Sequence, residues 1–205
     1  MLTGGASDID AFAAKLFAQN GAKVIIADVQ SDLHRRTDHF HLPPRPIGHL
    51  RQVQRRIQDR VEHWVTFEKR SKLDIMFSNA GIMGQLAGMQ IATTDSQDLA
   101  KVLEVNVRGA FHCAKHAARV MIGGKKGVII FTTSNITTMF GNAPHAYTTS
   151  KHVVVGLMKN LTVELGGYGV WVNSISPNGV PTPMAMNALG LDRRRFRSWV
   201  RSRRA

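Results

Sequence analysis

Apolar residues along this chain recur with two different periods, and the two periods alternate. Short apolar runs rich in β-branched residues, typical of buried strands, occur at residues 22–28, 73–77, 127–133 and 169–177. Apolar residues spaced three or four positions apart, typical of amphipathic helices, occur at residues 9–17, 95–122 and 145–166. Strands that alternate with helices in this way predict an α/β fold.

Three residues that can carry chemistry lie within this pattern. Ser134 follows the strand at 127–133, at the end where open α/β sheets bind ligands. Tyr147 and Lys151 are four positions apart, so a helix would place the ammonium beside the phenol and favour the phenolate. A phenolate could take up a proton at neutral pH, whereas a free phenol titrates near pH ~10. Such a pair also occurs by chance on many helices, so alone it is a weak indication.

Four short motifs, in this order along the chain, point to a known family. They are Ser78-Asn79-Ala80-Gly81, Asn106 within residues 105–109, the set of Ser134, Tyr147 and Lys151, and residues 176–183. In these motifs the chain resembles the short-chain dehydrogenase/reductase family. Its sequence is similar to plant members that oxidise secondary alcohols of terpenoids, lignans and hormone precursors. The resemblance covers roughly residues 1–33 and 71–192.

The resemblance implies a Rossmann-type doubly wound parallel sheet in a single domain, residues 1–192. We expect the sheet to be incomplete, with a first strand reduced to a stub before Gly4 and with the family's last strand absent. The third strand is not recognisable in a divergent basic insert at about 34–70, where three prolines within 43–46 exclude a central strand. The Arg-rich tail at 193–205 is expected to be disordered.

The resemblance also implies a nicotinamide dinucleotide cofactor. Gly4 opens a glycine turn, and Asp28 ends the second strand close to the ~20-residue offset expected for the acid that binds the adenosine ribose. A carboxylate there accepts both ribose hydroxyls and repels a 2′-phosphate, so Asp28 favours NAD over NADP, with a surface turn as the alternative. The other cofactor-binding residues implied by the family are Asn79, Ala80, Gly81, Tyr147, Lys151, Val180 and Thr182.

Two acids depart from the family's glycine turn. The family spacing Thr-Gly-x-x-x-Gly-x-Gly has Asp8 and Asp10 at its second and third glycines. Near a pyrophosphate, one carboxylate costs on the order of 4 kcal/mol at about 4 Å and a dielectric near 20. Acids also stabilise a helix N-terminus. We therefore expect Asp8 and Asp10 to stabilise the helix and to impair cofactor binding.

By resemblance, the catalytic residues are Ser134, Tyr147, Lys151 and Asn106. Ser134 would polarise the substrate oxygen and Tyr147 would take the hydroxyl proton. Lys151 would lower the pKa of Tyr147 and bind the ribose, and Asn106 would hold a water of the proton relay. For Asn106, a polar core residue satisfied by a neighbouring carbonyl is the alternative. The expected function is the NAD-dependent interconversion of a secondary alcohol and a ketone by hydride transfer.

Two other hypotheses stay open. One is a catalytically inactive relative, supported by the acids of the glycine turn and by the incomplete sheet. The other is a nucleic-acid-binding protein, suggested by the net charge of +13. Nucleic acid is the less expected partner, because +12 of this charge lies in residues 34–70 and 193–205, where the family pattern is missing.

Composition also indicates the cellular compartment and the ligands to expect. A single cysteine, Cys113, excludes an intrachain disulfide and fits a reducing compartment, and no apolar run suits a membrane span, so a cytoplasmic protein is expected. Four histidines between residues 34 and 49 match no ligand signature, so no metal is expected. The family implies a small hydrophobic alcohol or ketone as substrate and a homo-oligomer formed through the helices at 95–122 and 145–166.

Overall fold

The structure is a computed structural model that describes residues 1–4, 8–28 and 72–202. The basic insert at 34–70, with the unrecognised third strand and the histidines, lies outside the described residues, so the predictions for it stay predictions.

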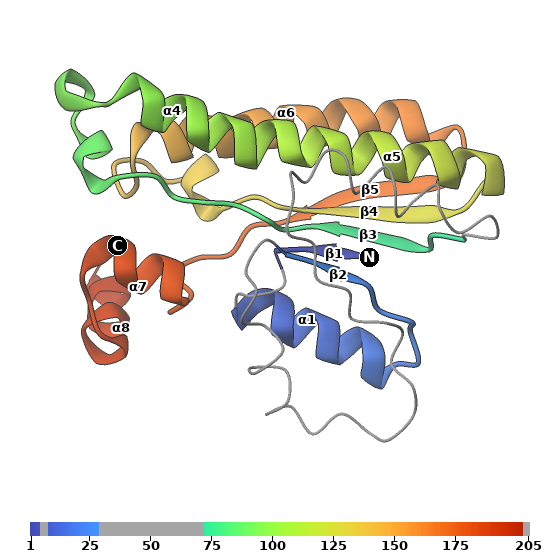
Figure 1. Cartoon of the computed structure of the whole chain (residues 1–205), viewed down its shortest axis with the longest axis horizontal. Coiled ribbons are helices and arrows are strands. Elements are labelled where there is room, and N and C mark those ends of the chain that lie inside the picture. Colours follow the sequence, from blue (N-terminus) through green and yellow to red (C-terminus); the bar gives the residue numbers. More distant parts are fainter. Residues whose placement is uncertain (5–7, 29–71, 203–205) are drawn as a thin grey trace.

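Five parallel strands form one sheet, in the order β2-β1-β3-β4-β5 (Figure 1). Their bounds are Leu2–Thr3 for β1, Ile26–Ala27 for β2, Ile75–Ser78 for β3, Gly127–Thr132 for β4 and Val170–Ile175 for β5. Parallel strands joined by helical crossovers confirm the predicted Rossmann-type fold. β5 forms one edge of the described sheet, in keeping with the expected incomplete sheet.

Helices cover both faces of this sheet (Figure 1). One face carries α1, and the other carries α4, α5 and α6, while α7 and α8 lie together at one end of the sheet. Their bounds are Asp8–Gln19 for α1, Ser96–Leu103 for α4, Gly109–Gly124 for α5, His145–Gly166 for α6, Pro183–Leu189 for α7 and Arg193–Ser202 for α8. A π-helical turn, Glu104–Arg108, joins α4 to α5 in the long helix that the sequence predicts. Within the described ranges, no helix combines the length and apolar character that a bilayer crossing requires.

Two hydrophobic clusters hold the layers together. The larger cluster joins the sheet to α5 and α6 through fully buried side chains such as Met76, Phe131 and Leu165. The smaller one joins the sheet to α1, and its buried members include Leu2 and Ile26. The central strand β3 is mostly buried, whereas burial alternates along β5, whose Trp171 is 71% exposed.

The first strand is a stub, as predicted, yet it is central to the sheet. Leu2 of β1 pairs with Ile26 of β2 on one side and with Phe77 of β3 on the other. Met1 adds to this ladder, because its amino group donates to the carbonyl of Ile75 at 2.7 Å. Burial lowers the pKa of this amino group to about 6. Two residues and their flanking bonds thus connect the halves of the sheet.

The C-terminal tail is a correction to the sequence prediction. Residues 193–202, expected to be disordered, form α8, and only 203–205 lie outside the described residues. The Asp192 carboxylate accepts a hydrogen bond from the backbone N–H of Arg195 at 2.8 Å, which caps the helix. Phe196 and Val200, one helical turn apart, are buried. Local capping and an apolar face therefore order a segment whose composition alone suggested disorder.

Candidate active site

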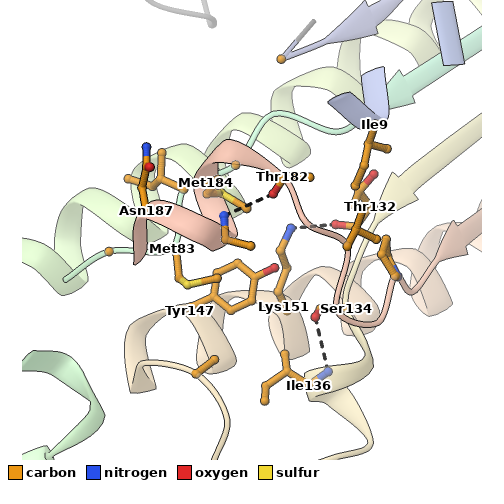
Figure 2. Close-up of a pocket in the computed structure, with 18 of the residues that line it drawn as sticks. Ile9, Met83, Thr132, Ser134, Ile136, Tyr147, Lys151, Thr182, Met184 and Asn187 are labelled. Carbon is orange, nitrogen blue, oxygen red and sulfur yellow. Dashed lines mark hydrogen bonds between the residues drawn. The ribbon is translucent and has the colours of Figure 1, made fainter. Parts of the chain in front are cut away.

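A cavity of ≈ 1110 Å³ opens along the carboxyl ends of the strands. Its lining runs from Gly4 and Asp28, after β1 and β2, to Ser134 after β4 and Thr182 after β5. All strands run in the same direction, so the loops that follow them meet at one edge of the sheet. Figure 2 shows the part of this cavity around Tyr147.

Ser134 is held at the second position after the end of β4. Its backbone is extended, with φ −166° and ψ 154°, and its hydroxyl accepts a hydrogen bond from the N–H of Ile136 at 3.4 Å, which begins a short 3-10 helix, Asn135–Thr137. The side chain is buried at the cavity wall. The hydroxyl in turn donates to the side-chain oxygen of Asn135 at 3.4 Å, so these two bonds together fix its position.

Tyr147 reaches the same wall from the first turn of α6. Both its phenol and the Ser134 hydroxyl line the cavity, although residues of two different elements carry them. Burial raises the pKa of Tyr147, and the nearby Ser134 hydroxyl offsets only part of that effect. Two groups that are thirteen residues apart in the sequence thus meet at one wall of the cavity.

Lys151 lies one turn further along α6. Its ammonium lies 5.5 Å from the centroid of the Tyr147 ring and donates to the carbonyl of Thr132 at 2.8 Å (Figure 2). Burial lowers the pKa of Lys151 from 10.5 to about 8. The ammonium therefore predominates at pH 7, roughly tenfold over the free amine.

The pKa of Tyr147 is set mainly by its burial. Burial raises this pKa and the Ser134 hydroxyl opposes the rise, so the predicted lowering by Lys151 stays a prediction. The ammonium is directed to the Thr132 carbonyl rather than to the phenol oxygen. Tyr147 consequently keeps its proton at neutral pH in this state of the protein.

Asn106 is placed behind the cavity rather than in its wall. It lies in the π-helical turn, is buried, and does not line the cavity. Its amide group donates to the carbonyl of Ile82 and to the hydroxyl of Ser150, both at 2.9 Å, and its oxygen accepts from the N–H of Ile82 at 2.8 Å. The side chain is thus satisfied by protein groups, as the alternative reading stated, and the predicted water relay stays a prediction.

The residues predicted to bind the cofactor all lie around the one cavity. Its lining includes Gly4, Asp28, Asn79, Ala80, Gly81, Val180 and Thr182, together with Tyr147 and Lys151. Gly4 has φ +86°, and a Cβ there would lie 2.7 Å from the Cα of Ala80, so only glycine fits this close approach. Thr182 accepts a bond from the N–H of Ala185 at 3.2 Å, which leaves its hydroxyl proton free to donate to a ligand.

The side chain of Asp10 is turned away from the cavity, although the sequence places Asp10 in the glycine turn. Its neighbour Ile9 lines the cavity, but Asp10 does not, and its side chain is 0% exposed. The Asp10 carboxylate accepts a hydrogen bond from the side-chain amide of Asn79. The Asp10 carboxylate is therefore directed to Asn79 rather than into the cavity. The effect on affinity stays a prediction, and the side chain of Asp8 lies outside the description.

Sequence reasoning missed the apolar end of the cavity. Its lining there includes Met83, Met139, Met184, Phe196 and Trp199. Met83 lies beside the Tyr147 ring in Figure 2. The spacing of Phe196 and Val200, one helical turn apart in the tail, was the signal that could have identified α8 as part of the site. The side-chain amide of Asn135 donates a hydrogen bond to the side-chain oxygen of Asn178 at 2.9 Å, which joins the loops after β4 and β5. No pattern in the sequence predicted this bond.

Comparison with known proteins gives related sequences over most of the chain. A family model described as short chain dehydrogenase matches residues 1–190. The chain is 46% identical over 200 residues to short chain aldehyde dehydrogenase 1 of Euphorbia lathyris, a match that covers 93% of this chain and 66% of the relative. It is 45% identical over 194 residues to secoisolariciresinol dehydrogenase of Forsythia intermedia, covering 93% and 69%. The chain thus spans about two thirds of the length of these curated relatives.

A solved structure agrees with the sequence matches. The fold superposes on levodione reductase with a TM-score of 0.86 and 29% identity, over 98% of this chain and 79% of that one. NAD-bound xylitol dehydrogenase matches with a TM-score of 0.75 and 28% identity, over 86% and 68%. With its motifs, its sheet order and the grouping of Ser134, Tyr147 and Lys151 at one cavity, the chain belongs to the short-chain dehydrogenase family.

Proposed function

We propose that this protein is an NAD-dependent oxidoreductase that interconverts a secondary alcohol and a ketone. The observation that supports the proposal best is the grouping of the Ser134 hydroxyl, the Tyr147 phenol and the Lys151 ammonium at one wall of the cavity. These groups supply a hydrogen-bond donor, an exchangeable proton and a positive charge within reach of one substrate oxygen.

The cavity suits a dinucleotide at its glycine end. Gly4 approaches Ala80 too closely to carry a side chain, and a Cβ at Gly81 would lie 3.5 Å from the Lys151 ammonium. When bound, the nicotinamide ring supplies the site that exchanges hydride with the substrate carbon. Asp28, at the far end of this part of the cavity, would accept the ribose hydroxyls and disfavour a 2′-phosphate, which is the basis for proposing NAD rather than NADP.

The protein groups would handle the proton. Ser134 and Tyr147 would both bond the substrate oxygen, and Tyr147 would give its proton to the oxygen during ketone reduction or take it during alcohol oxidation. Burial keeps Tyr147 protonated at neutral pH. We therefore expect reduction to be favoured near neutral pH and oxidation to become faster as pH rises and the phenol ionises.

The substrate is proposed to be apolar. Methionine and aromatic side chains line the cavity beyond Tyr147, among them Met83, Met184 and Trp199. Flexible, polarisable methionines adapt to irregular apolar shapes, and a flat indole supplies a large contact area. A hydrophobic alcohol or ketone with a single polar oxygen directed at Tyr147 would match this lining.

The chain offers a matched pair of variants for the test, because it has two tyrosines. Tyr147→Phe should lower turnover of NAD with a panel of cyclic secondary alcohols by at least about a hundredfold, while NAD affinity by calorimetry changes little. Tyr168→Phe, at an exposed position, should behave as wild type. Equal turnover in Tyr147→Phe and Tyr168→Phe would refute the assignment of Tyr147. Wild-type protein that binds neither NAD nor NADP would instead support an inactive relative.

Self-association is proposed as well. The outer faces of α5 and α6 present Phe111 at 51%, Val153 at 43% and Val163 at 84% exposure. These apolar side chains, together with the family resemblance, support a homo-oligomer formed through the two long helices. Light scattering after size exclusion tests this: a Val153→Glu variant should shift the mass toward that of one chain, and an unchanged mass would count against this interface.

A cytoplasmic location is proposed on the basis of the single cysteine. Cys113 is a buried free thiol on α5, and the chain can form no internal disulfide. Imaging of a fluorescent fusion in cells tests the location, and a signal confined to a secretory compartment would refute it.

A further inference from the structure

One acid of the glycine turn has a role that the proposed function does not use. We propose that Asp10 is a positioning residue: it fixes the side chain of Asn79 and, through Asn79, supports the wall that carries Lys151. The inference deepens the proposed function, since it concerns the same cavity. It also differs from the expectation that the acids of this turn stabilise the helix and impair cofactor binding.

The hydrogen bonds form a continuous chain from α1 to α6. The side-chain amide of Asn79 donates to the Asp10 carboxylate, and the amide oxygen of Asn79 accepts from the hydroxyl of Thr132 at 2.6 Å. The carbonyl of Thr132 in turn accepts from the Lys151 ammonium at 2.8 Å, a bond drawn in Figure 2. Asp10 is thus three hydrogen bonds away from a residue of the proposed catalytic set.

The backbone on either side of this chain is held as well. The N–H groups of Asn79 and Ala80 both lie within hydrogen-bond distance of the hydroxyl of Thr3, at 3.2 and 3.3 Å. Asn79 is therefore bound from β1 through its backbone, and from α1 and β4 through its side chain. Because Asn79 lines the cavity while Asp10 does not, Asp10 acts on a ligand only through Asn79.

The hydrogen bond between residue 10 and Asn79 favours a carboxylate at position 10 over the glycine of the family spacing. Asp10 is the third residue of α1, where a negative charge is stabilised by the positive end of the helix dipole. A carboxylate is also a stronger acceptor than a neutral group for the Asn79 amide. Glycine would remove this acceptor and leave the orientation of the Asn79 side chain to its bond with Thr132 alone.

Whether NAD binds more weakly or more tightly to Asp10→Gly separates a positioning role of Asp10 from a disturbing one. If Asp10 positions Asn79, Asp10→Gly should weaken NAD binding by about tenfold, because a partly buried donor loses its partner. If Asp10 only disturbs the cofactor site, restoring the family's glycine should tighten binding. Asp10→Asn keeps an acceptor oxygen and should stay within about threefold of wild type. Asp74→Gly removes an exposed carboxylate outside the cavity and serves as the control.

Two further readouts keep the inference testable on its own. Asn79→Ala should weaken NAD binding at least as much as Asp10→Gly does, and the double variant should be no weaker than Asn79→Ala, since the bond to Asp10 is already lost there. In cofactor-free protein, selective ¹⁵N-asparagine NMR should show the Asn79 side-chain amide shifted in Asp10→Gly and close to wild type in Asp10→Asn. A thermal melt of each variant confirms that the protein compared is folded.

The outcomes distinguish the inference from the function on which it rests. Wild-type protein that binds no NAD, with the Asn79 amide shifted in Asp10→Gly, would overturn the proposed function and support the positioning role. An unshifted Asn79 amide, or unchanged or tighter NAD binding in Asp10→Gly, would overturn the positioning role alone. A lower kcat in Asp10→Gly, in addition to the weaker NAD binding, would support the connection to Lys151.

Discussion

Removal of the buried ammonium by Lys151→Met tests the electrostatics of the site directly. Burial lowers the pKa of Lys151 from 10.5 to about 8, and the side chain is only 4% exposed, so solvent screening is small. At ~1.4 kcal/mol for each tenfold change in proton affinity, the difference corresponds to about 3 kcal/mol of folding free energy. Below pH 8 the folded protein carries this cost, because it holds the ammonium away from water.

The direction of the pH dependence follows from proton binding in the two states. Between pH 8 and 10.5 the unfolded chain holds the Lys151 proton and the folded protein has released it. The unfolded state then binds more protons, so stability rises with pH across this window. Above it, lysine is neutral in both states and the cost is gone. Lys151→Met carries no such group, so the wild-type rise should be missing from the variant.

Urea unfolding followed by circular dichroism, at constant ionic strength from pH 7 to 10.5, measures the effect. The difference in unfolding free energy, wild type minus Lys151→Met, should rise by about 3 kcal/mol over this range. Other buried groups that titrate here, the Met1 amine, the Cys113 thiol and the Tyr147 phenol, are present in both proteins and cancel. Repeating the pair in a Tyr147→Phe background removes any coupling to the phenol. A difference that stays flat within about 0.5 kcal/mol would refute the reasoning.

Three further substitutions or treatments test other parts of the structure. Gly4→Ala should destabilise the fold by at least about 2 kcal/mol, because the new methyl group would overlap Ala80 at a positive φ. Gly21 also has a positive φ, +80°, but open space around it, so Gly21→Ala should destabilise the fold less, and urea unfolding of the two variants measures the difference. Phe196→Ala should cost about 3–4 kcal/mol by the same measurement if α8 is packed as described, and a cost near zero would show that it is not. Burial raises the pKa of the Cys113 thiol to about 11, so iodoacetamide at pH 8 should modify unfolded but not native protein in a mass spectrum.

Local sequence patterns determined most of the helices and their functional residues. The helix predicted at 145–166 has those bounds in the structure, because its apolar spacing and the absence of interior proline are local properties. The same spacing places Tyr147 and Lys151 on one face. The strand at 127–133 and the position of Ser134 at its end were also readable, because a β-branched run followed by polar residues marks where a strand stops.

Segments whose order depends on distant partners were not predicted. The composition of residues 193–202 indicated disorder, but Phe196 and Val200 find a surface at the end of the sheet, and a Cβ at Gly179 would lie only 2.5 Å from Val200. The two-residue strand β1 was readable as a stub, yet its bonds with both neighbours are what make it a usable centre of the sheet. Both results come from contacts between residues far apart in sequence.

The sequence alone thus determined which groups could do chemistry, and the tertiary structure decided their state and direction. Spacing could not show that burial raises the pKa of Tyr147 and lowers that of Lys151, because desolvation depends on everything packed around a group. Spacing also placed Asp10 in a phosphate-binding motif, while the packing of α1 against the sheet turns its carboxylate to Asn79. Residue type and period are local properties, whereas exposure and hydrogen-bond partners are set by the whole fold.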